Sequence, residues 1–392
     1  MVFETLGIRT VTSIMLVAAA QGLAFTPAQE SKASEDYAES IAEAQSDLDA
    51  GRISEARRKL EATEESLRGF EYQYLVARAE ATRDKGPAPE LLQTIEAPKV
   101  ATRYGVLSPV DRQLAFICRD ASVRVYDLDN PEALKRVVTH ESGGAIWSGV
   151  FSLDGTTFVA GFESGEVVAY DAKTWEHHTT IAIGEKPVRE LAVAPDGSAL
   201  VAEGESALQL WSLADVKPKK VAEVGERYNF GEGLTFSPKG DLIATGGMFD
   251  INLYDARTGE QIRSMNHASY TMGLEFSPDG ARIASAPRGN VNKFLAVFDV
   301  AQGKKQFNAG PFRCYVHGGI FTSDGKRIVS MACRKVPSLQ LFDSTTGQLV
   351  FSLSRKATGT KPMVSRDGRL LGWSEPRGYK YIELPGPVDA DD

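Results

Sequence analysis

Residues 274 to 285 read LEFSPDGARIAS, an alternation of apolar residues with polar or small ones that a Ser-Pro-Asp-Gly turn interrupts. Leu274 and Phe276 are two positions apart before the turn, and the alternation resumes after it. Pro278 presets the φ angle of the turn, and Gly280 supplies the positive φ angle that closes it. The stretch therefore predicts a β-hairpin with one face turned toward a core.

The same hairpin recurs along most of the chain. A near copy, LTFSPKGDLIAT, occupies residues 234 to 245, and five further copies, the first of them degenerate, complete the series. Consecutive turns lie 40 to 45 residues apart, which is the period of a propeller blade with about four short strands. The seven turn positions are Asp111, Gly155, Gly197, Gly240, Gly280, Gly325 and Gly368.

In five of the seven copies an aromatic residue and an aspartate follow the turn. The pairs are Tyr126-Asp127, Tyr170-Asp171, Tyr254-Asp255, Phe298-Asp299 and Phe342-Asp343. Over roughly residues 88–392 this pattern resembles the repeat of the WD40 family. The resemblance implies an all-β fold, a seven-bladed β-propeller of four-stranded blades. The degenerate repeats, with a helical segment ahead of them, resemble the bacterial exported type of this family.

Two features differ from the family pattern. Family blades usually carry a Gly-His dipeptide ahead of the aromatic-Asp pair, and none of the five histidines here follows a glycine. Copies three and seven have Trp211-Ser212 and Ile382-Glu383 where the family has its aspartate. The buried His-Asp hydrogen-bond network of the family is therefore not expected.

The last repeat is one strand short. It ends with YKYIEL at residues 379–384, which corresponds to the third strand of its blade. Residues 90–97, ELLQTIEA, precede the first blade and look like the outer strand of blade six, GQLVFSLS at residues 347–354. We expect residues 90–97 to complete the seventh blade, because this closes the ring without an open edge.

The first 28 residues are predicted to be a signal peptide. Arg9 precedes an apolar run over residues 11–25, which is shorter than the about 20 residues of a membrane-spanning helix. Small residues after Val17 offer cleavage sites. Residues 1–28 therefore predict an exported protein, periplasmic or extracellular; the alternative is an uncleaved membrane anchor formed by residues 11–25.

Residues 31–85 are predicted to be helical. Tyr37, Ile41, Ala44 and Leu48 recur at spacings of three or four and form one apolar stripe. We expect the aromatic residues of this segment to pack against the propeller.

The first predicted helix is also acidic. It carries six acidic residues and no basic residue between Lys32 and Arg52. The two interpretations are a solvated helix face and a docking face for a basic partner. The whole chain has a net charge of −8, which argues against binding of nucleic acid, because phosphates require a basic surface.

An exported chain allows disulfides to form. If the blade-six hairpin pairs Phe321 with Lys326, its register places Cys314 opposite Cys333. The sequence allows two interpretations of this pair, a disulfide and two reduced, buried thiols. Cys118 is left over and is expected to be a buried thiol.

The sequence contains no convincing catalytic motif. His140, His267, His317 and Glu232 fall near the entrances of several inner strands, but their spacing matches no metal site, so neither a metal nor a cofactor is predicted. The segment YDARTGEQI, residues 254–262, resembles quinoprotein propellers. A lactonase-like or quinoprotein-like enzyme with its substrate at the central channel is therefore the main alternative function.

The loop charges separate along the chain. Loops of blades two and three carry Glu141, Glu163, Glu166, Glu203, Glu205 and Glu226. Loops of blades five to seven are basic, and we expect them to bind an acidic surface of a partner protein by charge-assisted hydrogen bonds. A non-catalytic interaction scaffold is thus the predicted function, and binding of an anionic envelope glycan is a second alternative. The predicted binding residues are Arg288, Lys293, Arg313, Arg334, Lys335, Lys356 and Arg377.

Overall fold

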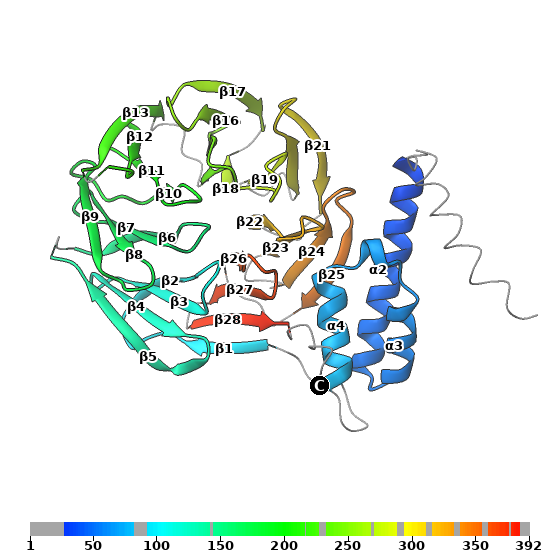
Figure 1. Cartoon of the computed structure of the whole chain (residues 1–392). Coiled ribbons are helices and arrows are strands. Elements are labelled where there is room, and N and C mark those ends of the chain that lie inside the picture. The colour runs from blue at the N-terminus through cyan, green and yellow to red at the C-terminus, as the bar shows by residue number, and fades with distance from the viewer. Residues whose placement is uncertain are drawn as a thin grey trace, which may run out of the picture.

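The computed structural model of the chain describes residues 27–81, 92–141, 144–215, 217–226, 233–267, 270–287, 294–310, 316–332, 338–354, 360–375 and 378–384. Within these ranges the strands form seven four-stranded antiparallel sheets, arranged as blades around a central axis (Figure 1). The predicted seven-bladed β-propeller with a short helical segment before it is confirmed.

In each blade the first strand lies innermost and the last lies at the rim (Figure 1). Blade one contains β2 (Thr102–Leu107), β3 (Gln113–Cys118), β4 (Ser122–Asp127) and β5 (Asn130–Thr139). Blade two contains β6 (Ile146–Phe151), β7 (Thr157–Phe162), β8 (Glu166–Asp171) and β9 (His177–Ala182). Blade three contains β10 (Leu191–Val193), β11 (Ala199–Glu203), β12 (Ala207–Ser212) and β13 (Lys219–Glu226). Blade four contains β14 (Leu234–Phe236), β15 (Leu242–Gly246), β16 (Asp250–Asp255) and β17 (Gln261–Asn266).

The remaining blades follow the same plan. Blade five contains β18 (Thr271–Phe276), β19 (Arg282–Pro287), β20 (Leu295–Asp299) and β21 (Lys304–Ala309). Blade six contains β22 (Val316–Phe321), β23 (Arg327–Ala332), β24 (Ser338–Asp343) and β25 (Leu349–Ser354). Blade seven contains β26 (Thr360–Val364), β27 (Leu370–Glu375), β28 (Gly378–Glu383) and, as its outer strand, β1 (Leu92–Glu96).

The ring closes through β1, which pairs antiparallel with β28 from Leu92 opposite Ile382 onward. Residues 90 and 91 of the predicted closing strand lie outside the described residues. Arg112 of blade one adds an ionic contact across the same junction, since its Nη1 and Nη2 donate to the two carboxylate oxygens of Glu383 at 2.5 and 3.0 Å. Blade seven is thus joined to the start of the propeller by both backbone and side-chain bonds.

The aspartate of the repeated turn stabilises it by accepting hydrogen bonds from neighbouring residues. In the turn of blade five, Ser277 Oγ donates to Asp279 Oδ1 at 2.5 Å, and the Ala281 amide donates to the same oxygen at 2.9 Å. Gly280 follows with a φ angle of 74°, which residues other than glycine rarely adopt. The bonds to Ser277 and the Ala281 amide lower the pKa of Asp279. The Ser-Pro-Asp-Gly motif is therefore a self-contained turn.

The aspartate of the aromatic-Asp pair has a second local role. Asp255 Oδ1 accepts hydrogen bonds from the amides of Arg257 and Thr258, at 2.9 and 2.8 Å. These bonds close the turn between the third and the outer strand of blade four, so this aspartate acts as a turn cap.

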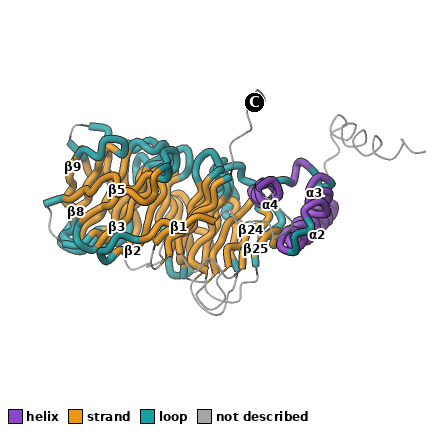
Figure 2. Tube along the Cα trace, turned by 90° about the horizontal axis from the view of Figure 1, so that it is seen from below, coloured by secondary structure: helices purple, strands orange, loops and turns teal. Residues whose placement is uncertain are grey.

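The helices pack on the outside of blades six and seven (Figures 1 and 2). They are α2 (Pro27–Asp49), α3 (Ile53–Glu61), the short 3-10 helix η1 (Glu65–Leu67) and α4 (Phe70–Ala81). No helix in the described part of the chain is long and apolar enough to cross a membrane. The predicted signal peptide falls on residues 1–28, of which residues 1–26 lie outside the described ranges.

One apolar core joins the helices to the propeller. The outer strand β25 buries Val350, Phe351 and Leu353, whereas the outer strands β9 and β17 each bury a single residue. A helix that covers an edge strand removes a site for unwanted pairing. The expected packing of the helical segment against the propeller is confirmed. Members of this core include Tyr37, Ile41, Leu48, Phe70, Tyr74, Val350, Phe351, Leu371, Trp373 and Ile382.

Candidate interaction surface

The predicted basic residues of blades five to seven lie in the parts of the chain that the structure does not describe. These are Arg288, Lys293, Arg313, Arg334, Lys335, Lys356 and Arg377, and the same holds for Cys314, Cys333 and Glu232. Their roles stay predictions. The register assumed for the Cys314–Cys333 pair is wrong, however, because Phe321 pairs with Ile328 and not with Lys326. Cys118 is described and is a free, buried thiol, and burial raises its pKa to about 11.

The inner strands of blades one and two each have an unpaired second residue. The register between β2 and β3 shifts between Thr102 and Tyr104, which leaves Arg103 out of the ladder. Trp147 occupies the same position in β6. Bulges of this kind re-aim a side chain away from the alternation of the strand. They bring Arg103 and Trp147 together across neighbouring blades.

Two arginines flank Trp147. The guanidinium carbon of Arg103 lies 3.7 Å from the centroid of the Trp147 ring, and that of Arg189, just before β10, lies 5.1 Å from it. Both distances fall within the range of a cation–π interaction. Arg103 is also held by a 2.7 Å hydrogen bond from its Nε to the Ile146 carbonyl. We call these three side chains, from three consecutive blades, the arginine–tryptophan stack.

The surroundings of the stack are mainly positive. Burial, and after it the charge of Arg119, lowers the pKa of Arg103. Glu163 partly offsets this charge, and its carboxylate accepts the Ala145 amide at 3.1 Å. Arg103 is half-buried, whereas Arg189 is exposed. A ligand that approaches from solvent would therefore meet the exposed Arg189 first, with the half-buried Trp147 and Arg103 beside it.

The stack is not evident from the charges of single loops, because its three side chains come from three different repeats. Arg103, Trp147 and Arg189 each lie eight residues before the turn position of their own repeat. Comparison of equivalent positions in the aligned repeats would have shown two arginines and a tryptophan in succession.

The acidic residues of blades two and three have mixed environments. Glu141, Glu163 and Glu205 are exposed, but Glu203 is buried. The side chain of Glu226 is not among those described. The acidic side of this face is therefore smaller than the sequence suggested.

The histidines near the inner strands do not gather into one site. His140 packs against Phe162 of blade two, while His267 is buried against Phe298 of blade five. Among the side chains that the structure describes, no three His, Cys, Asp or Glu residues group as a metal centre. The His317 side chain and Glu232 are outside that set.

Glu275 lies on the inner strand β18, between the buried Leu274 and Phe276. Burial raises its pKa to about 7, above the about 4.3 of an unfolded chain. Its contribution to stability is therefore full below about pH 4.3 and is lost as the pH rises toward 7. In urea unfolding, Glu275→Gln is expected to be more stable than the wild type at pH 8 by about 1–3 kcal/mol, and by less at pH 5. A pH-independent difference would contradict this assignment.

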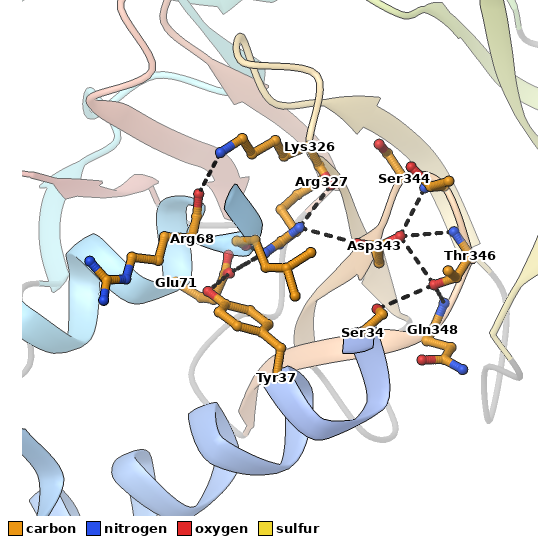
Figure 3. A network of polar contacts seen from close by, with 12 residues as sticks. Ser34, Tyr37, Arg68, Glu71, Lys326, Arg327, Asp343, Ser344, Thr346 and Gln348 are labelled. Carbon is orange, nitrogen blue, oxygen red and sulfur yellow. Dashed lines mark hydrogen bonds and ion pairs between the residues drawn. The ribbon is translucent and has the colours of Figure 1, made fainter. Parts of the chain in front are cut away.

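A buried ionic network fixes the helices to blade six (Figure 3). Arg327 of β23 donates from Nε and Nη2 to Glu71 Oε1 of α4, at 3.0 and 2.6 Å, and the Tyr37 hydroxyl donates to the same oxygen at 2.6 Å. Arg327 Nη2 also donates to the Leu67 carbonyl, and Asp343 lies 3.4 Å from Nη1. Burial opposes the charge of Arg327, but Glu71 outweighs it and raises the pKa.

The acidic residues of α2 divide between structure and solvent. Asp47 is buried and forms ion pairs with Arg52 and Lys59, at 2.7 and 2.8 Å. Asp36 and Glu39 are exposed on the outer side of the helix. Fewer acidic residues of α2 therefore face solvent than the sequence predicted, because Asp47 is used to hold α2 to α3.

The fold defines the class of seven-bladed β-propellers, and the chain is similar in sequence to WD-repeat proteins. No protein-family model matches the chain. Relatives by sequence include the serine-threonine kinase receptor-associated protein of Rattus norvegicus, 25% identical over 198 residues, which are 47% of this chain and 51% of that protein. The U3 small nucleolar RNA-associated protein 4 homolog of Mus musculus is 26% identical over 245 residues, 61% of this chain and 29% of that protein.

A WD-repeat protein with a BTB/POZ domain, from Acanthamoeba polyphaga mimivirus, is 23% identical over 43% of this chain and 35% of its own length. The chain spans about half the length of the first curated relatives that it matches. Among solved structures, a chain of the mitotic checkpoint complex superimposes with a TM-score of 0.62 and 18% identity, over 75% of this chain and 91% of that one. This last likeness shows the fold.

Proposed function

We propose that the chain is a non-catalytic protein-interaction scaffold, and that the propeller face with the arginine–tryptophan stack binds an acidic surface of a partner protein. The stack is the observation that carries this proposal. Tryptophan and arginine are the residue types that most often dominate the energy of protein interfaces. The guanidinium groups of Arg103 and Arg189 would donate charge-assisted hydrogen bonds to carboxylates, and the Trp147 ring supplies apolar contact.

The strand ends of the blades support an extended binding face. In a four-stranded antiparallel blade, the start of the first and third strands and the end of the second and fourth lie on one side. Arg103 and Trp147 are at the start of their inner strands. The basic residues predicted from the sequence fall between the second and third strands of a blade or between two blades. We therefore propose that they belong to the same face as the arginine–tryptophan stack.

The names of the relatives support an interaction role. The matched proteins are named as associated with a kinase receptor or with a small nucleolar RNA. Export through residues 1–28 is a separate proposal, which N-terminal sequencing of the mature protein tests.

Arg189→Glu and Trp147→Ala are expected to weaken partner binding by at least about tenfold, because each removes one side chain of the arginine–tryptophan stack. The matched control is Lys219→Glu, which makes the same charge change on the exposed outer strand of blade three. The partner is first captured from extract with the wild-type chain, and the affinities of the purified variants for it are then measured at two salt concentrations. Binding by Arg189→Glu should also show a smaller salt dependence.

Equal affinities for all variants would reject the stack as the binding site. Direct binding to polyanionic sugars without any captured protein would favour the glycan alternative. A tightly bound cofactor in the purified chain, with turnover of a lactone or alcohol substrate, would favour a propeller enzyme.

A further inference from the structure

Two histidines of neighbouring blades converge on one point at the rim of the propeller. His140 Nε2 lies 3.1 Å from Thr180 Oγ1, and His177 Nε2 lies 2.9 Å from the same oxygen. The centroids of the two imidazole rings are 5.5 Å apart. His140 follows the outer strand of blade one, and His177 and Thr180 belong to the outer strand of blade two.

The local backbone explains the arrangement. A register shift between Ala169 and Tyr170 leaves His178 without a partner in the ladder of β8 and β9. The extra residue changes the alternation of β9, so that His177 and Thr180 come to the same face. His140 is held by contact with the buried Phe162 ring, at 5.6 Å between centroids.

The electrostatics of the pair suit a cation. The carboxylates of Glu166 and Glu141 act on His140 and favour a positive charge there. A threonine hydroxyl has one proton, so it can donate to only one of the two ring nitrogens, and the other imidazole must donate to it. Neutral imidazole nitrogens directed at one point are also the usual ligands of divalent transition metals.

We propose that His140 and His177 form a binding site for a divalent transition-metal ion such as Zn²⁺, which joins the rims of blades one and two. The two Nε2 atoms would be the protein ligands, at about 2.0–2.1 Å from the ion, and water would complete the coordination. The Thr180 hydroxyl turns away about χ1 to admit the ion, and the carboxylates of Glu141 and Glu166 favour its charge. This site is separate from the arginine–tryptophan stack and does not depend on the proposed scaffold function.

Calorimetric titration of the untagged, chelator-treated chain with ZnCl₂ tests the site. The wild type is expected to bind one ion saturably, and His140→Ala and His177→Ala are each expected to bind at least about tenfold more weakly. Because His177 is exposed, its replacement leaves the fold intact. The matched control is His178→Ala, which removes the exposed neighbour in the bulge and is expected to bind as the wild type does.

A thermal unfolding series gives an independent measurement. Zn²⁺ at concentrations above its dissociation constant is expected to raise the Tm of the wild type and of His178→Ala, but not that of His177→Ala, because only a ligand of the folded state stabilises it. The proposal is overturned if the wild type shows no saturable binding, or if His177→Ala binds Zn²⁺ as tightly as the wild type.

Discussion

Glu71→Ala is expected to lower the free energy of unfolding by about 3–5 kcal/mol, because it leaves the guanidinium of Arg327 buried without its main carboxylate. Arg327 is 1% exposed and Glu71 is 0% exposed, so water cannot replace the lost partner without a structural change. Asp343, at 3.4 Å from Nη1, is too weak a contact to compensate. Urea unfolding followed by circular dichroism measures the loss.

Two further variants make this prediction specific. Glu39→Ala removes an exposed carboxylate from α2, and it is expected to change stability by less than about 0.5 kcal/mol. The double variant Glu71→Gln with Arg327→Met is expected to recover much of the loss, because replacing both charged side chains by neutral ones leaves no unpaired ion in the core. A loss below 1 kcal/mol for Glu71→Ala would show that the helices are not held by this network.

Trp373→Ala is expected to destabilise the protein by about 3–5 kcal/mol, the range of large-to-small replacements in a core. Trp373 is 0% exposed and lies in the core that joins blades six and seven to the helices. Its Nε1 donates to Glu375 Oε1 at 2.8 Å, so the variant also removes this hydrogen bond. The measurement is again the free energy of unfolding from urea titration.

The control for Trp373 is an aromatic residue at the surface. Phe249 is 59% exposed, and Phe249→Ala is expected to change stability by less than about 0.5 kcal/mol. Similar losses for Trp373→Ala and Phe249→Ala would mean that the core between the helices and the propeller contributes little. A single unfolding transition for the wild type is expected, because the shared core couples the two parts.

The site was less predictable than the fold, and the reason differs between its parts. Charges in loops are visible in the sequence, and they led to a basic sector that the described residues do not include. The arginine–tryptophan stack depends on the bulges at Arg103 and Trp147, and bulges have no strong sequence signal. His140 and His267 both precede inner strands in the sequence, but in the fold His140 lies beside Phe162 and His177 of blade two.

The sequence by itself determined the blade count and the strand order. Each hairpin is encoded locally, because its aspartate, its glycine and its apolar alternation act over a few residues. The unpaired third strand at the end of the last repeat required an outer strand from elsewhere in the chain, and β1 occupies that place.

Only the tertiary structure decided which distant side chains meet. Glu71 and Arg327 are 256 positions apart and come together because ring closure brings blade six beside the N-terminal helices. Arg103, Trp147 and Arg189 meet because consecutive blades stack side by side. Such contacts follow from the angle and spacing of whole blades, which many apolar side chains set jointly, so no short stretch of sequence encodes them.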